Sequence, residues 1–229
     1  MKRMLFIALA LVLAAIGPNI FPAAQAGYGD LSTFATHMLL PAIAALLILA
    51  LALRHRQPDI WQAIAWGAAA GAIATLALEA VRLTGYRLGY MPGNLPRLMG
   101  VLLLNRFAQG PNLSSDIAGW AYHFWNGASF GIIYALVFGT RRLWTGVVYG
   151  LAIGVGFMLS PVVSSLGVGY FGLQFSKGFP VTVLLAHAAF GLALAWLAKR
   201  WTQAQRSVFW ASARACFQRP VPLTVSRKA

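Results

Sequence analysis

Acidic and charged residues are scarce in this sequence of 229 residues. Four residues are Asp or Glu against 18 Lys and Arg, and charged residues make up 10% of the chain, whereas hydrophobic residues make up 59%. Soluble domains carry about a quarter charged residues, so this composition excludes that class and indicates an integral membrane protein. Ala, Leu and Gly dominate without strand-period alternation, which argues against a barrel and favours helices.

Cysteine and known catalytic motifs are also lacking. Cys216 is the single cysteine, which excludes an internal disulfide and a thiolate-rich metal centre. The sequence contains no G-x-S-x-G nucleophile elbow, no Walker loop and no dinucleotide-binding fingerprint. These absences leave open whether the protein is an enzyme.

The apolar segments are long enough to cross a bilayer core, which takes about 20 helical residues. Their length and composition predict an all-α, polytopic transmembrane helix bundle of five or six spans. The predicted spans are Met4–Phe21, Leu31–Leu53, Ile60–Leu83, Ile117–Phe138, Trp144–Ser165 and Val181–Ala198. Between the third and fourth spans, Leu95–Phe107 has the pattern of an amphipathic helix that lies on the outer membrane surface or folds back as a lid.

The sequence divides into three parts. Residues 1–26 are either the first span or a signal peptide, because basic residues precede a short apolar run and Ala24-Gln25-Ala26 forms a small-residue cleavage motif. Both interpretations stay open. Residues 27–200 form the transmembrane bundle, and residues 201–229 form a basic cytoplasmic tail, for which we expect disorder beyond Pro222.

Most basic residues flank the predicted spans at one membrane face. This face holds thirteen of the 18 Lys and Arg residues, and the positive-inside rule makes it cytoplasmic. Both termini are therefore expected in the cytoplasm, with the tail lying on the anionic inner leaflet. The same distribution accounts for the net charge of +14 without a nucleic-acid partner, and the sequence leaves the protein partners open.

Three histidines and one glutamate fall inside the predicted spans, each on a different helix: His37, Glu79, His123 and His187. Counting about 1.5 Å of rise per residue from the span ends places all four roughly 6–9 Å below the outer boundary. Ionisable groups in a membrane are costly and usually face the bundle interior, where they serve a site. Their common depth predicts a polar pocket in the outer third of the bundle.

Three imidazoles and one carboxylate are a ligand set for a divalent transition metal. Neutral imidazole suits Zn, Fe, Cu or Ni, and the carboxylate adds charge, so we predict that the four groups bind such a metal or haem iron for membrane-embedded chemistry. Asn126 and Ser160 reach a similar level and are expected to contact the cofactor or its ligands. No local spacing motif such as H-x-x-x-H supports the set.

Two other interpretations use the same residues. In a proton-coupled or small-solute transporter, Glu79 and the histidines act as a relay, although the inner halves of the spans offer few polar groups. In a structural or assembly subunit, each histidine donates to a backbone carbonyl of a neighbouring helix, and Glu79 pairs with Arg82 or Arg87.

The last three predicted spans carry a resemblance to a known group of proteins. Trp120-Ala121-Tyr122-His123-Phe124-Trp125-Asn126-Gly127, followed by Phe130-Gly131, Tyr134, Trp144, Gly146, Pro161, His187 and Lys199-Arg200, resembles bacterial inner-membrane proteins of the YagU-like type. The resemblance implies a multi-pass protein of the bacterial inner membrane. It implies no activity, because those proteins have no settled biochemical role.

Overall fold

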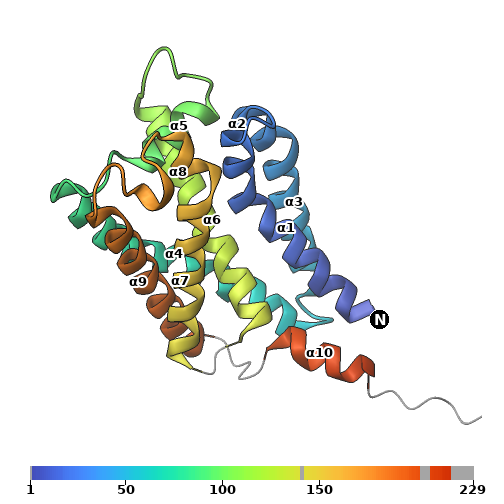
Figure 1. Cartoon of the computed structure of the whole chain (residues 1–229). Helices are drawn as coiled ribbons and strands as arrows, with labels where there is room; N and C mark the ends of the chain where they lie inside the picture. Colours follow the sequence, from blue (N-terminus) through green and yellow to red (C-terminus); the bar gives the residue numbers. More distant parts are fainter. Residues whose placement is uncertain (1, 140–141, 202–206, 218–229) are drawn as a thin grey trace, which may run out of the picture.

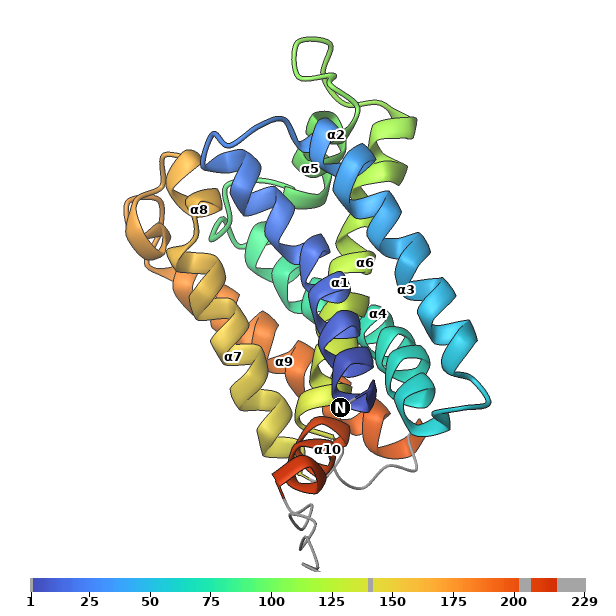
Figure 2. The ribbon, with the colours of Figure 1, turned by 90° about the vertical axis from the view of Figure 1, so that its right-hand side faces the viewer.

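The computed structural model describes residues 2–139, 142–201 and 207–217, and the regular secondary structure of these three ranges is entirely helical (Figures 1 and 2). This confirms the predicted all-α fold class. Much of the predicted basic tail, including the disorder expected beyond Pro222, lies outside the described residues.

Four helices are long and apolar enough to cross a membrane. They are α1 (Lys2–Gln25), the continuous helix formed by α2 (Leu31–Phe34), η1 (Ala35–Leu39) and α3 (Leu40–Leu53), α4 (Pro58–Arg87), and α9 (Gly178–Trp201). α6 (Leu113–Val137) has 25 residues, but polar residues such as His123 and Asn126 lower its mean hydropathy. α7 (Leu143–Leu159) is apolar and shorter. By helix length and hydropathy the chain is a multi-pass membrane protein.

The predicted fifth span is not one continuous helix. α7 ends at Leu159, Ser160 has an extended backbone (φ −75°, ψ 159°), and α8 (Pro161–Ser165) follows. Pro161 has no N–H to donate and disfavours a helical residue before it, which explains the break. A short 3-10 turn, η2 (Tyr170–Gly172), connects α8 to α9.

Residues at the helix starts explain where two central helices begin. The side chain of Asn112 accepts a hydrogen bond from the backbone N–H of Ser115 at 2.9 Å, and the Ser115 hydroxyl accepts one from the N–H of Asn112 at 2.8 Å. This capping box satisfies two backbone donors at the start of α6. α4 begins at Pro58, whose missing N–H costs nothing in a first turn.

Glycines bring the central helices into backbone contact. A Cβ atom added to Gly71 on α4 would overlap the carbonyl oxygen of Gly127 on α6, and one added to Gly131 would overlap that of Gly67. Gly146 on α7 meets α9 in the same way. Small residues allow this approach between membrane helices, so glycines spaced four residues apart form packing seams of the bundle.

The bundle has two distinct ends (Figure 1). One, which we call the α5 end, carries α5 (Leu95–Leu103), α8 and η2; the other, the α10 end, carries the start of α1 and α10 (Val208–Phe217). The predicted amphipathic helix is confirmed in a shorter form, and it is folded back on α6. Gly100 of α5 packs against the backbone of α6, and Arg97 and Asp116 form an ion pair at 3.1 Å across the two helices.

At the α10 end, a single arginine ties three segments together. Arg3 of α1 forms an ion pair with Asp59 in the first turn of α4, and it donates to the side chains of Gln57 and Ser212, both at 2.6 Å. Ser212 lies on α10 and is buried. The contacts fix α10 across the end of the bundle beside the start of α1, as Figure 2 shows.

Candidate functional site

A cavity of about 550 Å³ lies among the helices near the α5 end. α1, α4, α5, α6, α7, α8 and α9 all contribute to its wall, which is mostly apolar and includes Phe130, Phe157, Phe179 and Phe190. The polar residues on the wall are Asn19, Thr75, Arg82, Asn94, His123, Asn126, Ser160, Thr182 and His187. An apolar cavity with a few convergent polar groups is the usual form of a small-molecule site.

Glu79 and Arg82 form a buried ion pair behind this wall. They lie three residues apart on α4, so their side chains leave the helix on the same face. The Arg82 Nε atom is 2.8 and 2.9 Å from the two carboxylate oxygens, and its Nη2 atom donates to Glu79 Oε2 at 2.6 Å. The side chain of Arg82 is only 7% exposed and that of Glu79 only 6%. Each buried charge therefore has the partner that burial requires.

His123 extends this pair from α6. Its Nε2 atom lies 2.9 Å from Glu79 Oε1. Because a carboxylate only accepts hydrogen bonds, Nε2 carries the donated proton, and in the neutral ring Nδ1 remains as an acceptor. Glu79 thus orients His123 and is itself held by Arg82. Arg82 and His123 line the cavity, and Glu79 connects them.

His187 presents a second imidazole to the same cavity. Its Nδ1 atom donates to the backbone carbonyl of Val183 at 2.8 Å, which leaves Nε2 as an acceptor in the neutral ring. The ring stacks on Phe157 with centroids 6.1 Å apart. On α7, Gly154 makes room for it, since an added Cβ would lie 3.0 Å from His187 Cγ. The ring orientation is therefore fixed from both sides.

Two buried polar atoms of the wall residues have no protein partner. Neither Arg82 Nη1 nor Asn126 Oδ1 makes a hydrogen bond to any described residue. A buried donor or acceptor without a partner costs about 1–3 kcal/mol, and such groups are rare in native structures. Both atoms belong to residues of the cavity wall, one on α4 and one on α6.

The structure separates the predicted site residues into two groups. Glu79 and His123 are hydrogen-bonded, and His187, Asn126 and Ser160 line the cavity beside them. The Ser160 hydroxyl is already engaged, because it donates to the carbonyl of Phe157 at 2.7 Å.

His37 lies apart from the others. It sits in the π-helical turn η1, its side chain is exposed, and it is not among the cavity-lining residues. Depth along a span was predicted from the sequence, but the rotation of the helix was not, and this helix turns His37 outward.

The predicted metal centre does not fit this arrangement. In the described ranges, no group of three or more His, Cys, Asp and Glu side chains is placed to hold a metal ion. Both carboxylate oxygens of Glu79 already bond to Arg82 or His123, and His37 is absent from the site. The carboxylate therefore acts as an anchor for two neighbouring side chains.

Arg82 is the wall residue whose role the sequence did not reveal. Its spacing of three from Glu79 correctly indicated a neutralising partner, and the structure selects Arg82 over Arg87. The free Nη1 atom gives no signal in the sequence, because it depends on which groups α6 and α9 bring near it. The histidines also differ from the structural interpretation: His187 bonds to a carbonyl of its own helix, and His123 bonds to a carboxylate.

Comparison with known proteins adds a family and no activity. The model of a family of unknown function, DUF6789, matches residues 61–208, more than half of the chain. The matched segment contains Arg82, His123 and His187, whereas α1 and α3 lie outside it. No curated protein and no solved structure matches the chain. These comparisons give no support to the resemblance to YagU-like proteins.

Proposed function

The chain belongs to DUF6789, a family of unknown function, and from its geometry we propose that it binds a small amphipathic molecule in the cavity at the α5 end. The polar head of the ligand offers a carboxylate or phosphate oxygen to Arg82, and its apolar body lies against the aromatic and aliphatic walls. We further propose that the protein resides in a bacterial inner membrane with the α10 end in the cytoplasm, because the basic residues gather there.

The observation that carries this proposal is the unpartnered Nη1 atom of a deeply buried arginine. Arg82 uses Nε and Nη2 on Glu79, and Nη1 is left without a protein acceptor. A guanidinium favours carboxylate and phosphate oxygens because its donors form a planar fork. His123 lies beside Arg82, because both side chains bond to Glu79.

The size and lining of the cavity support an amphipathic ligand. Its volume falls within the range of about 300–1,000 Å³ that is usual for small-molecule sites. Apolar side chains make up most of its wall, so burying an apolar chain there is favourable by about 25 cal/mol per Å² of area removed from water. A purely polar solute would leave these walls without a partner.

The packing toward the α10 end favours a binding site over a transport path. There α4 and α6 are in backbone contact through Gly67 and Gly131. Tyr134, Leu136 and Leu194, which lie farther along, are fully buried. A solute moving on from the cavity would have to separate these helices.

Equilibrium binding of palmitate to the detergent-purified full chain tests the proposal, with hexadecanol as the matched probe without a carboxylate. Arg82→Lys keeps the positive charge and removes the planar fork. The double variant Glu79→Gln/Arg82→Gln removes both charges, so that neither remains buried alone. Each variant is expected to weaken palmitate binding by about tenfold or more, since a hydrogen bond to a charged group contributes about 1.5–3 kcal/mol.

Hexadecanol should bind the wild type and both variants with similar, weaker affinity. Palmitate affinity that is unchanged in two folded variants would contradict the assignment of Arg82 to the head group.

A further inference from the structure

We infer that the ligand is a membrane lipid with a single acyl chain, and that it reaches the cavity sideways from the bilayer, through a mouth between α1 and α7. This inference rests on the proposed binding function and adds the source and route of the ligand. The juxtaposition that supports it is a pair of residues, one on α1 and one on α7, that both line the cavity and are exposed.

The two residues are Asn19 on α1 and Gly156 on α7. Both belong to the cavity wall, and both are exposed. Apart from its chain neighbours and the backbone of its own helix, nothing lies within 4 Å of a Cβ added to Gly156. Exposed wall residues mark openings; Pro92 and Leu166 at the α5 end are also of this kind, and the pair on α1 and α7 marks the opening that lies among apolar surface.

The surroundings of the mouth are those of lipid. α1 is one of the helices apolar enough to cross a membrane, and α7 is apolar along its length. Next to the mouth, Val12, Val155 and Leu159 are exposed large apolar side chains. Exposed apolar surface of this kind suits hydrocarbon and not water.

Contacts at the α5 end close the mouth on the side nearest the membrane surface. α8 packs against the end of α1, and the Ser165 hydroxyl donates to the side-chain oxygen of Gln25 at 2.6 Å. The bridge joins α1 and α8 at this level, and in Figure 2 α1 and α7 are separate helices.

Asn19 places a polar side chain at the mouth. Its Nδ2 atom donates to the carbonyl of Ala15 at 2.7 Å, which leaves the carboxamide oxygen for another partner. Polar side chains in membrane spans are costly where they face lipid and usually serve a ligand or a path. A lipid head group entering between α1 and α7 passes Asn19 before it reaches Asn126 and Arg82.

The opening explains why the ligand has one acyl chain. The head group lies at Arg82, which is 6% exposed, so the chain must extend along the apolar wall toward the mouth. A cavity of about 550 Å³ suits one such chain and a small head, and it resembles single-ligand pockets in size.

The route is tested by photolabelling in phosphatidylcholine nanodiscs that contain the full chain. Diazirine-labelled palmitate is added, the sample is illuminated after increasing delays, and labelled peptides of α6 and α9 report arrival in the cavity. Labelling of the lipid-facing side of α3 reports probe in the bilayer. Gly156→Trp, and the smaller Gly156→Leu, place a side chain in the mouth, whereas Val155→Trp adds the same bulk to the lipid-facing surface one residue away.

We expect Gly156→Trp to slow labelling of α6 and α9 by at least about tenfold, with a smaller effect for Gly156→Leu and none for Val155→Trp. Gly93 lines the cavity from the loop between α4 and α5 and also has open space at its Cβ. Slowing by Gly93→Trp, with wild-type rates in both Gly156 variants, would show access from the aqueous side and overturn the sideways route while leaving the binding function intact. Absence of labelling of α6 and α9 in the wild type at every delay would overturn the binding function itself.

Discussion

The buried ion pair offers the sharpest test of the structure, through a double-mutant cycle on Glu79 and Arg82. Each single substitution, Glu79→Gln and Arg82→Gln, leaves one buried charge without its counterpart. The double variant leaves two neutral amides of similar shape. The two positions are joined by three contacts of 2.6–2.9 Å, and both side chains are more than nine-tenths buried.

The magnitude follows from this burial. Removing one member of a buried ion pair costs about 3–5 kcal/mol, mainly because the remaining charge stays in a poor solvent. Removing both members costs far less. The losses of unfolding free energy in the two single variants should therefore add up to more than the loss in the double variant, by over about 2 kcal/mol. Arg82→Gln is expected to be the milder single change, because His123 still bonds to Glu79.

The assay is reversible unfolding in mixed micelles of increasing dodecyl sulfate content, followed by tryptophan fluorescence. Asp116→Asn serves as the control, since it removes the ion pair between Asp116 and Arg97. The side chain of Arg97 is 53% exposed and that of Asp116 is 31% exposed. Exposed pairs contribute about 0–1 kcal/mol, so this variant should unfold close to the wild type. Additive effects of the two single substitutions, within about 0.5 kcal/mol, would refute the buried-pair reasoning.

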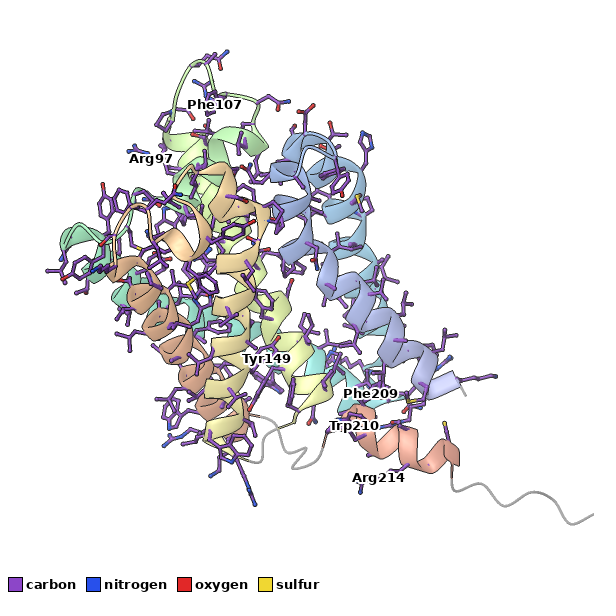
Figure 3. The ribbon with its side chains drawn as sticks, in the orientation of Figure 1. Arg97, Phe107, Tyr149, Phe209, Trp210 and Arg214 are labelled. Atoms are coloured by element: carbon purple, nitrogen blue, oxygen red, sulfur yellow. The ribbon has the colours of Figure 1, made fainter. Side chains whose placement is uncertain are left out.

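Two further predictions concern packing and topology. Gly71→Ala should destabilise the bundle by about 1–3 kcal/mol in the same assay, because its methyl group overlaps the Gly127 carbonyl, whereas Gly156→Ala meets open space and should be nearly neutral. For topology, a membrane-impermeant maleimide should label Phe107→Cys (in a Cys216→Ala background) in intact cells. Native Cys216, at the opposite end of the bundle, should be labelled only after permeabilisation; the reverse pattern would contradict the proposed orientation, and Figure 3 shows Phe107 far from α10.

The spans and their seams were predictable because they depend on local properties of the chain. Length, apolar composition and helical spacing are read within one segment, and each of the six predicted spans corresponds to helical structure. The glycine pairs on α4 and α6 lie four residues apart in the sequence, the spacing that puts small residues on one helix face for backbone contact. The predicted fifth span corresponds to two helices, because Pro161 interrupts it at Ser160.

The candidate site could be predicted only in part. The sequence located ionisable residues at one depth, since depth follows from the count of residues along a helix. It also identified Glu79 and His123, which the structure joins, and His187, which lines the same cavity. It did not predict that His37 would be exposed, because the rotation of a helix depends on which faces its neighbours cover.

The sequence by itself thus determined an all-helical membrane protein, the position of its spans, and the level at which its buried charges lie. The tertiary structure alone decided which of these groups meet, and that Arg82, on the wall of an apolar cavity, has a buried donor without a partner among the described residues. The physical reason is that hydropathy and helical rise act along one helix, whereas a binding site is formed by the faces that several helices turn toward each other. In this bundle those faces are set by backbone contact at glycines far apart in the chain.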